Sequence, residues 1–546
     1  MFIMKFKIFL SFLILFQVAA AVFARTPVSV LRKQAEIKRR NSLTSRDVDP
    51  STLYPAYNIS VPVDHFQNES KYAPHSSDNF NLRYWFDASY YKEGGPVIVL
   101  ESGETDASER LPFLQKGIVS QLMQATGGVG VILEHRYYGT SFPTADLSTE
   151  NLRFLTTEQA MADVAYFAQN VKFAGVNKTL TAPGTPYIVY GGSYAGAFVA
   201  FLRTQYPHLF WGAISSSGVT KAIYDYWQYF EPIRQLAPPD CVRATQQLTN
   251  VVDNILMKPN NSAKIAELKG VFGLGNLTDN RDFANSLTGG IYGWQSRSWD
   301  PAINSPGFFY YCQNVTATTR LYPDTASLGS TVNDLLAAGG YGNNEALQIE
   351  MLNYIGYINL TVVSGCEGET LDQCLSTLNT AFYQQDDYSQ QGWRSWDYQV
   401  CTQWGYIQTG SGVPKGELPL ISRTLDLEYL TVFCRDAFNI TSPPDVQAIN
   451  KYGGFDIHYS RLAIIGGQAD PWRPATPLAD EARPRKSTTS EPVLEIPDAV
   501  HHWDENGLFP NETTATLPPN SIVYAQQFEK DFVLEWMNEW QNHYKR

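Results

Sequence analysis

The chain has 546 residues, of which 44% are hydrophobic and 17% charged, and its formal net charge is −13. This length is too great for one small domain and predicts two domains or one domain with a large insertion. The negative charge disfavours nucleic acid and anionic membrane surfaces as partners.

The first 24 residues have the pattern of a secretory signal peptide. Lys5 and Lys7 precede an apolar run over residues 8–16, and small residues follow at 19–24. The apolar run is shorter than the roughly 20 residues that span a bilayer. We therefore expect cleavage after residue 24 and no membrane anchor in the mature protein.

Residues 25–46 are basic and weakly hydrophobic, and they predict a removable pro-segment with a processing site at residues 38–40; a solvated tail is the alternative. Residues 1–46 carry a net charge of +8, so a mature chain that begins at Asp47 would carry −21. Such self-repulsion eases when carboxylates are protonated, which favours work in an acidic medium. The expected location is outside the cell, with a vacuole-like or lysosome-like compartment as the alternative.

From about residue 80, strand-like and helix-like segments alternate. Apolar runs at 96–100 and 129–134 precede a helical pattern at 157–171. Continuous apolar strands that alternate with helices are typical of a parallel sheet covered on both faces.

The next strand-like run, Tyr187–Tyr190, leads into Gly191-Gly192-Ser193-Tyr194-Ala195-Gly196 and then an apolar helical pattern. Small residues on both sides of a serine permit the sharp strand-to-helix turn of a nucleophile elbow, which holds the hydroxyl away from the sheet. Ser193 is therefore the predicted nucleophile. An ordinary glycine-rich turn is the alternative.

After residue 219 the character of the sequence changes. Residues 220–454 are rich in aromatic residues and interrupted by helical patterns such as 222–235, whereas strand-like runs return at 461–466 and 493–496, before a helical pattern at 524–544. We predict an α/β-hydrolase fold with an inserted, mainly helical, disulfide-bonded cap domain. The hydrolase domain would comprise residues 47–219 and 455–546, and the cap residues 220–454.

The six cysteines lie in the middle of the chain, and an even number in a secreted protein favours disulfides. The short loop favours Cys366 with Cys374, which leaves Cys241 with Cys312 and Cys401 with Cys434 as the expected pairs. The cysteines and histidines lack the spacing of a zinc site, so we expect neither a metal nor another cofactor.

A serine hydroxyl needs a base to take its proton, and the base needs a carboxylate to fix its tautomer. In this fold the acid and the histidine follow the serine in that order. Asp470 comes just after the strand-like run 461–466, and His501 and His502 follow the run 493–496. We predict Asp470 and His501, with Asp504 as the reserve acid.

The oxyanion hole of such a site needs two backbone N–H groups. Tyr194, directly after the nucleophile, would supply the first. The loop after the strand-like run 96–100 would supply the second, from Gly103 or Glu104.

Acceptor sequons for N-linked sugar are dense in the chain and predict surface positions in a secreted glycoprotein. They stand at Asn58, Asn68, Asn177, Asn260, Asn276, Asn314, Asn359, Asn439 and Asn511.

Several motifs together resemble one family of secreted serine peptidases, that of lysosomal prolyl carboxypeptidase, dipeptidyl peptidase II and the fungal acid prolyl endopeptidases. They lie at residues 134–139, 155–160, 191–196, 223–227, 396–405, 470–472 and 501–502. The resemblance covers most of the chain after residue 60. It implies a helical cap over the site, cleavage on the carboxyl side of proline, and the triad Ser193, Asp470 and His501.

The same resemblance implies that Trp472 and aromatic residues of the cap form a flat apolar pocket for the proline ring. Gln403 stands where several relatives carry an acidic residue, which puts recognition of a substrate amine there in doubt. The motifs do not separate exopeptidase from endopeptidase action.

A peptide is thus the expected substrate, hydrolysed through an acyl-enzyme. A secreted carboxylesterase or lipase of the same fold is a second reading, because the elbow is shared. A non-catalytic hydrolase-like binding protein is a third, and the intact Ser193, Asp470 and His501 argue against it. A homodimer is compatible with the sequence, which does not decide the oligomeric state.

Overall fold

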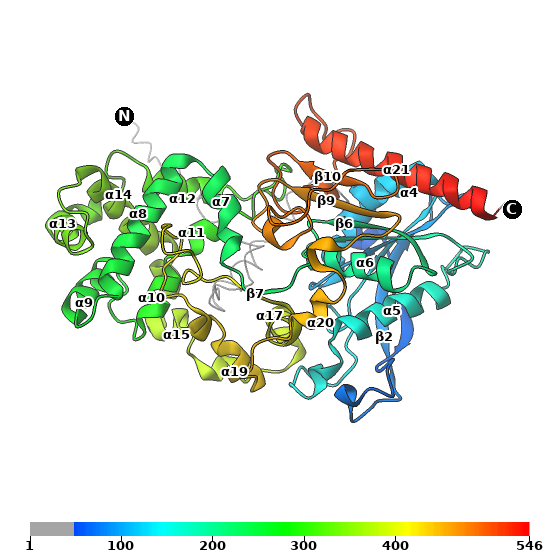
Figure 1. Cartoon of the computed structure of the whole chain (residues 1–546), viewed down its shortest axis with the longest axis horizontal. Coiled ribbons are helices and arrows are strands. Elements are labelled where there is room, and N and C mark those ends of the chain that lie inside the picture. Colours follow the sequence, from blue (N-terminus) through cyan, green and yellow to red (C-terminus); the bar gives the residue numbers. More distant parts are fainter. Residues whose placement is uncertain (1–47, 545–546) are drawn as a thin grey trace, which may run out of the picture.

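An eight-stranded sheet forms the centre of the hydrolase part (Figure 1). The structure is a computed structural model that describes residues 48–544, so the predicted signal peptide and pro-segment lie outside the described residues. The strand order is β1-β2-β4-β3-β5-β6-β9-β10. The strands are β1 (Tyr57–Pro62), β2 (Asn79–Asp87), β3 (Val97–Glu101), β4 (Val129–Leu133), β5 (Tyr187–Gly192), β6 (Phe210–Ser216), β9 (Leu462–Gly467) and β10 (Val493–Ile496).

The six strands from β4 to β10 in this order run parallel, whereas β1 and β2 add an antiparallel edge. The parallel strands include those expected from the sequence, and the α/β-hydrolase fold is confirmed. The edge strands β1 and β2 were not predicted from the sequence. In both, exposed residues alternate with more buried ones, a pattern that differs from the continuous apolar runs of the buried strands.

Helices cover both faces of the sheet. Along β3, Val97 and Val99 point into one core and Ile98 and Leu100 into the other, because successive side chains of a strand alternate. The first core is shared with α5 (Thr157–Asn170) and α6 (Tyr194–Gln205), and the second with α3 (Leu111–Gln115), α4 (Ile118–Thr126) and the terminal helix α21 (Asn520–Tyr544). A short helix, α2 (Pro50–Leu53), precedes β1.

Between β6 and β9 the chain leaves the sheet and builds a mainly helical layer beside it (Figure 1). Its helices are α7 (Glu231–Leu236), α8 (Pro239–Leu256), α9 (Ser262–Val271), α10 (Asn280–Ser286), α11 (Gly289–Tyr292), α12 (Gly307–Val315), α13 (Gly329–Ala338), α14 (Glu345–Thr361), α15 (Leu371–Leu375), α16 (Thr380–Tyr383), α17 (Gln391–Gln399), α18 (Leu427–Leu430), α19 (Val432–Phe438) and α20 (Gln447–Asn450). We call this layer the cap.

One predicted helix of the cap was wrong in its first half. Residues 222–235 begin with the strand β7 (Ile223–Asp225), continue as a single 3-10 turn (Trp227–Phe230), and only then form α7. β7 pairs in parallel with β8 (Gly405–Ile407), about 180 residues further along the chain. A three-residue strand whose partner is so distant has no local periodicity that could reveal it.

Three disulfides cross-link the cap. Cys241 of α8 is bonded to Cys312 of α12, Cys366 to Cys374, and Cys401 to Cys434 of α19. This is the pairing expected from the sequence.

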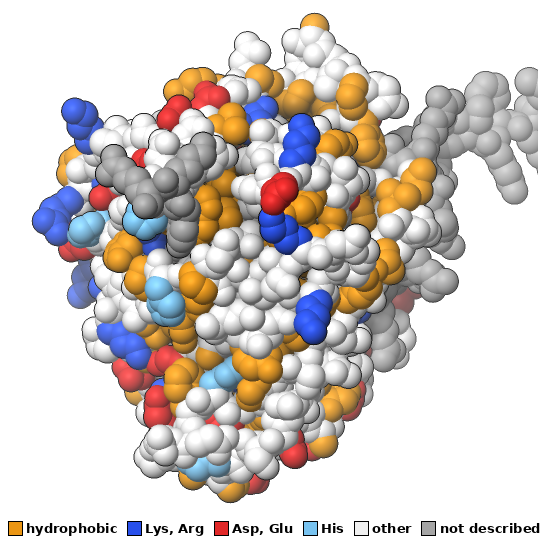
Figure 2. Space-filling model, turned by 90° about the vertical axis from the view of Figure 1, so that its right-hand side faces the viewer, with side chains coloured by type: hydrophobic (Ala, Val, Ile, Leu, Met, Phe, Trp, Pro, Cys, Tyr) orange, Lys and Arg blue, Asp and Glu red, His pale blue; other side chains and the backbone are white. Residues whose placement is uncertain are grey.

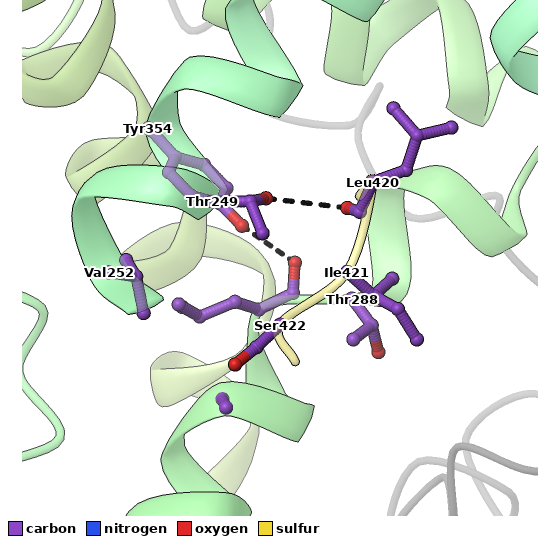
Figure 3. Close-up of a pocket in the computed structure, with 9 residues that line it drawn as sticks. Thr249, Val252, Thr288, Tyr354, Leu420, Ile421 and Ser422 are labelled. Carbon is purple, nitrogen blue, oxygen red and sulfur yellow. Dashed lines mark hydrogen bonds between the residues drawn. The ribbon is translucent and has the colours of Figure 1, made fainter. Parts of the chain in front are cut away.

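A small cavity lies within the cap. Figure 3 shows a cavity between α8 and the segment 420–422, where Thr249 donates to the carbonyl oxygen of Leu420. Its volume is about 10 Å³, which holds at most one water. This cavity is too small to bind a peptide.

The surface of the hydrolase part is mixed. In Figure 2, basic, acidic and apolar side chains are interspersed on the face that is turned to the viewer. Within residues 48–544, no helix is both long and apolar enough to cross a lipid bilayer.

Candidate active site

The turn between β5 and α6 has the geometry of a nucleophile elbow. Ser193 has φ 60° and ψ −125°, and α6 begins at the next residue. A Cβ on Gly191 would lie 2.3 Å from the carbonyl oxygen of Ala195, and one on Gly196 would lie 2.6 Å from that of Ser216. Both sites therefore require glycine, and the strained serine is held by the tight backbone around it.

His501 and Asp470 meet at the same edge of the sheet. Asp470 follows β9 and His501 follows β10, so both lie beyond the carboxyl ends of neighbouring parallel strands. The Nδ1 atom of His501 lies 3.0 and 2.9 Å from the two carboxylate oxygens of Asp470. Both side chains are buried.

The environment keeps Asp470 ionised. Burial alone would raise the pKa of this carboxyl, but the charge of His501, its hydrogen bond and the N–H of Trp472 together lower the pKa below its usual value. A carboxylate only accepts hydrogen bonds, so Nδ1 of His501 must carry the proton that it donates. The Nε2 atom of the neutral ring is then left as the basic nitrogen.

The neighbouring residues that the sequence offered as alternatives are engaged elsewhere. His502 pairs with Glu505 at 3.0 Å, and Glu505 packs against the elbow, since a Cβ on Gly192 would lie 2.3 Å from its carboxylate. Asp504 accepts hydrogen bonds from Tyr190 and from Ser216 Oγ instead of from His501. The sequence order alone does not distinguish His502 and Asp504 from His501 and Asp470, which contact each other.

The predicted oxyanion loop lies against the start of α6. Gly103 has φ 71°, and its Cβ would lie 3.3 Å from the Cβ of Ala195. The N–H of Gly103 donates to the Glu101 carboxyl at 2.8 Å, and the backbone of Glu104 is hydrogen-bonded to its own carboxyl, so these contacts do not separate the two candidates. The N–H of Tyr194 stands in the first turn of a helix, where it has no intrahelical acceptor.

Aromatic side chains form a wall beside His501. The ring of Trp472 stacks on Tyr226 at 5.4 Å and meets Tyr229 and Tyr406 edge to face. Its centroid lies 6.3 Å from that of His501. Tyr226 directly follows β7 and Tyr406 lies in β8, so the strands that the sequence did not reveal position this wall.

Segment 294–299 of the cap reaches the loops that carry the acid and the base. Trp294 donates to the carbonyl oxygen of Ala469, and Trp299 donates to that of Trp503. Gln295 accepts from both Trp472 Nε1 and Tyr229 Oη at 2.9 Å. An indole N–H only donates, so the accepting atom of Gln295 is its oxygen, and its NH₂ group is directed elsewhere.

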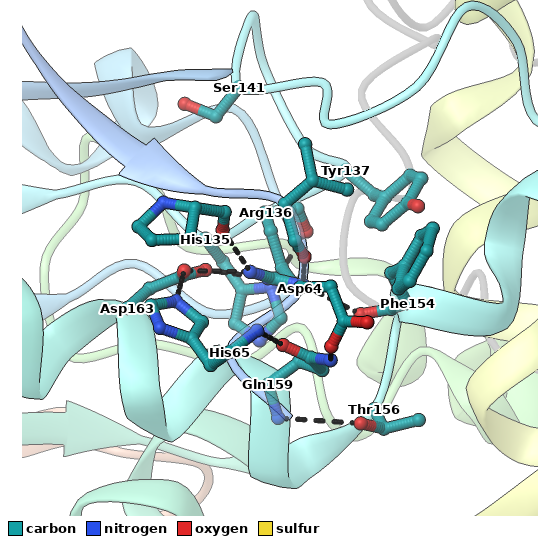
Figure 4. Close-up of polar contacts among 12 residues, drawn as sticks. Asp64, His65, His135, Arg136, Tyr137, Ser141, Phe154, Thr156, Gln159 and Asp163 are labelled. Atoms are coloured by element: carbon teal, nitrogen blue, oxygen red, sulfur yellow. Dashed lines mark hydrogen bonds and ion pairs between the residues drawn. The ribbon is translucent and has the colours of Figure 1, made fainter. Parts of the chain in front are cut away.

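Behind the elbow lies a buried ionic network that holds the loop after β4 (Figure 4). Arg136 donates to both oxygens of Asp163 at 2.6 and 2.7 Å and to the carbonyl oxygens of Val63 and Phe154. His65 contacts the same carboxylate at 2.8 Å. This network fixes the motif at residues 134–139 and has a structural role.

Gln403 contacts the hydrolase part of the chain. Its side-chain oxygen accepts from the N–H and hydroxyl of Thr157, at the start of α5. It therefore joins the cap to the hydrolase part.

The fold and these side chains define the chain as an α/β-hydrolase with a serine-type candidate site. The chain belongs to the serine carboxypeptidase S28 family, whose model matches residues 61–292 and 343–517. It is therefore a serine peptidase by family.

Two relatives illustrate the family. The chain is 55% identical over 524 residues to a probable extracellular serine carboxypeptidase of Arthroderma benhamiae, covering 95% of this chain and 73% of the relative. It is 26% identical over 513 residues to the thymus-specific serine protease of Mus musculus, covering 89% and 91%. The predicted secretion agrees with the extracellular description of the first.

Among solved structures, the chain is similar to a proline iminopeptidase of Mycobacterium smegmatis, with 12% identity and a TM-score of 0.31 over 88% of this chain and 99% of the other. It is also similar to a lipase in an open form, with 10% identity and a TM-score of 0.30 over 89% and 100%. Similarity at this level carries no information about function.

Sequence reasoning missed Ser217, Gln295 and Glu505, which support the candidate site. Ser217 accepts the N–H of His502 at 3.0 Å, and the contacts of Gln295 and Glu505 are given above. Polar residues of this kind form no motif by themselves, because their partners lie on distant elements.

Proposed function

We propose that this protein is a secreted serine carboxypeptidase that removes the residue following a proline, with Ser193 as nucleophile, His501 as general base and Asp470 as its orienting acid. The observation that carries the proposal is the buried contact between His501 Nδ1 and Asp470 at 2.9 Å, at the same edge of the sheet as an elbow serine with positive φ. This combination leaves Nε2 of His501 free to act as a base.

The chemistry follows from these groups. Ser193 Oγ attacks the carbonyl carbon while His501 Nε2 takes its proton, and the imidazolium that forms is stabilised by Asp470. Breakdown of the tetrahedral intermediate passes the proton to the leaving amine and leaves an acyl-enzyme. Water then attacks the ester with His501 again as base, and the acid product leaves. The N–H of Tyr194 and that of Gly103 or Glu104 would hold the oxyanion.

One feature supports preference for proline, and a second supports recognition of a peptide. The rings of Trp472, Tyr226 and Tyr406 form a buried apolar cluster beside His501, and aromatic grooves commonly hold rigid proline rings. The oriented NH₂ group of Gln295 is the candidate donor to a carbonyl or carboxylate oxygen of the substrate.

A set of four peptides tests the proposal. Each has a blocked amino end, and they combine proline or alanine at the penultimate position with a free or amidated carboxyl end. We expect mass spectrometry to show loss of the last residue from the proline peptide with a free carboxylate. The alanine peptide should react at least about tenfold more slowly, and the amide more slowly still. Equal cleavage of all four, or cleavage within the chain, would refute this specificity.

Ser193→Ala tests the nucleophile. We expect kcat to fall by at least about 10⁴-fold with an unchanged melting temperature, because the small side chain fits the elbow. Residual cleavage near the wild-type rate would exclude Ser193 as the nucleophile.

A further inference from the structure

The side chain of Tyr194 is held by a hydrogen-bond chain that joins the hydrolase part to the cap. We propose that Gln399 of the cap positions Tyr194 and thereby sets the oxyanion hole. This inference rests on the proposed function, because it assumes that the N–H of Tyr194, directly after Ser193, stabilises the oxyanion.

The direction of every hydrogen bond in the chain is determined by chemistry. His135 Nδ1 lies 2.8 Å from the carbonyl oxygen of Arg136, which can only accept, so Nδ1 carries the proton. His135 Nε2 therefore accepts from the hydroxyl of Tyr194 at 2.9 Å. The oxygen of Tyr194 in turn accepts from Gln399 Nε2 at 2.9 Å, and Gln399 Oε1 accepts from Tyr138 at 2.6 Å.

All of these groups are buried, so water does not replace a lost partner. Tyr138, His135, Tyr194 and Gln399 are each at most 2% exposed. A Leu at position 399 would leave both the oxygen of Tyr194 and the hydroxyl of Tyr138 without their partner. A buried polar group without a partner is unfavourable, so Tyr194 would be expected to move.

The cap also encloses the ring of Tyr194. Trp396 and Trp404 meet it edge to face at 5.2 and 4.9 Å. Gln399 ends α17 and is followed directly by a π-helical turn, Val400–Trp404. Such turns occur often at functional sites; here α17 presents Gln399 and Trp396, and the turn presents Trp404, to the same ring.

The burial of His135 allows the chain of hydrogen bonds to persist in mild acid. Burial lowers the pKa of His135 to about 4, although Asp163 opposes the shift, so Nε2 remains an acceptor at higher pH. Arg136 also faces this ring. Glu101 and Glu104 lie near Tyr194 and Tyr138, and Asp397 lies near Tyr138.

Two substitutions of Gln399 separate positioning from simple packing. Gln399→Leu should lower kcat by at least about tenfold at every pH, with KM changed by less than about threefold, because loss of a whole oxyanion donor costs about 10²–10³-fold. Unlike Gln399→Leu, Gln399→Glu should lower kcat in a way that depends on pH. A neutral Glu keeps one donor and one acceptor, whereas the carboxylate cannot donate to Tyr194. The ratio of the kcat of Gln399→Glu to that of wild type should be near one in acid and should fall as pH rises.

Gln391→Leu is the matched control. Gln391 belongs to the same helix and donates to the carbonyl oxygen of Gly139 at 3.1 Å, so it joins cap and loop without touching Tyr194. We expect its kcat to stay within about twofold of wild type.

The measurement is steady-state kinetics from about pH 4 to pH 9, because burial raises the pKa of a Glu at this position, together with titration of active enzyme by a fluorophosphonate. A kcat of Gln399→Leu equal to wild type, or a flat ratio for Gln399→Glu across this range, would overturn the inference while wild type still labels at Ser193. Wild type that does not label, with an active Ser193→Ala variant, would overturn the proposed function as well. If Gln399→Leu does not fold, the pH response of Gln399→Glu decides.

Discussion

A buried acidic pair behind the candidate site predicts that the folded protein is more stable in acid. Glu529 of α21 is fully buried beside Asp504 and close to Glu505. Burial, and then the charge of Asp504, raise the pKa of Glu529 well above its usual value. The pKa of Asp504 is raised as well, again chiefly by burial.

The sign and size of the effect follow from proton linkage. Above about pH 4.5 the unfolded chain loses the proton of Glu529 while the folded chain keeps it, so the free energy of unfolding falls by up to about 1.4 kcal/mol per pH unit. Unfolding about 500 residues changes the entropy by about 1 kcal/mol/K. Each pH unit should therefore lower the melting temperature by about 1.4 °C through this one group.

The substitution Glu529→Gln removes the titrating carboxyl. It should therefore also remove the loss of stability that this carboxyl causes as pH rises. By calorimetry, the variant should melt close to wild type at pH 4.5 and about 3 °C above it at pH 6.5. Glu535→Gln, on the exposed side of the same helix, controls for the change of net charge and should show no such trend. A difference between Glu529→Gln and wild type that is the same at every pH would refute the reasoning.

Two further substitutions test the acid of the site and the buried network. Asp470→Asn should leave the melting temperature nearly unchanged but lower kcat by about 10⁴-fold, because the amide no longer holds the required tautomer of His501; steady-state kinetics with a loss below about tenfold would contradict this role. Asp163→Asn removes the charge opposite the buried Arg136 and should cost about 3–5 kcal/mol, or about 3–5 °C in a calorimetric scan. An unchanged transition would show that the pair is not needed for stability.

The local pattern around the nucleophile was sufficient to predict its backbone. Small residues on both sides of Ser193 have a direct steric cause, since a Cβ at Gly191 would lie 2.3 Å from a carbonyl oxygen. The buried parallel strands were predicted for a similar reason, because continuous apolar runs between helices have few other structures open to them. The catalytic roles of Ser193, Asp470 and His501 remain predictions.

Other elements carried no such signal. The edge strands β1 and β2 were missed, and residues 222–225 were predicted as helix although Ile223–Asp225 pairs with a strand near residue 405. The cap therefore positions Tyr226 and Tyr406 through a contact between distant segments. Propensity and periodicity within a short window do not report such pairings.

The sequence by itself determined the turn at Ser193 and the order of the candidate acid and base, because both depend on residue type and on spacing along the chain. Only the tertiary structure decided that His501 rather than His502 meets Asp470, that Asp504 turns to Tyr190, and that Gln399 reaches Tyr194. Those choices depend on which buried polar groups come together when distant elements pack, and a buried polar group is stable only with a partner.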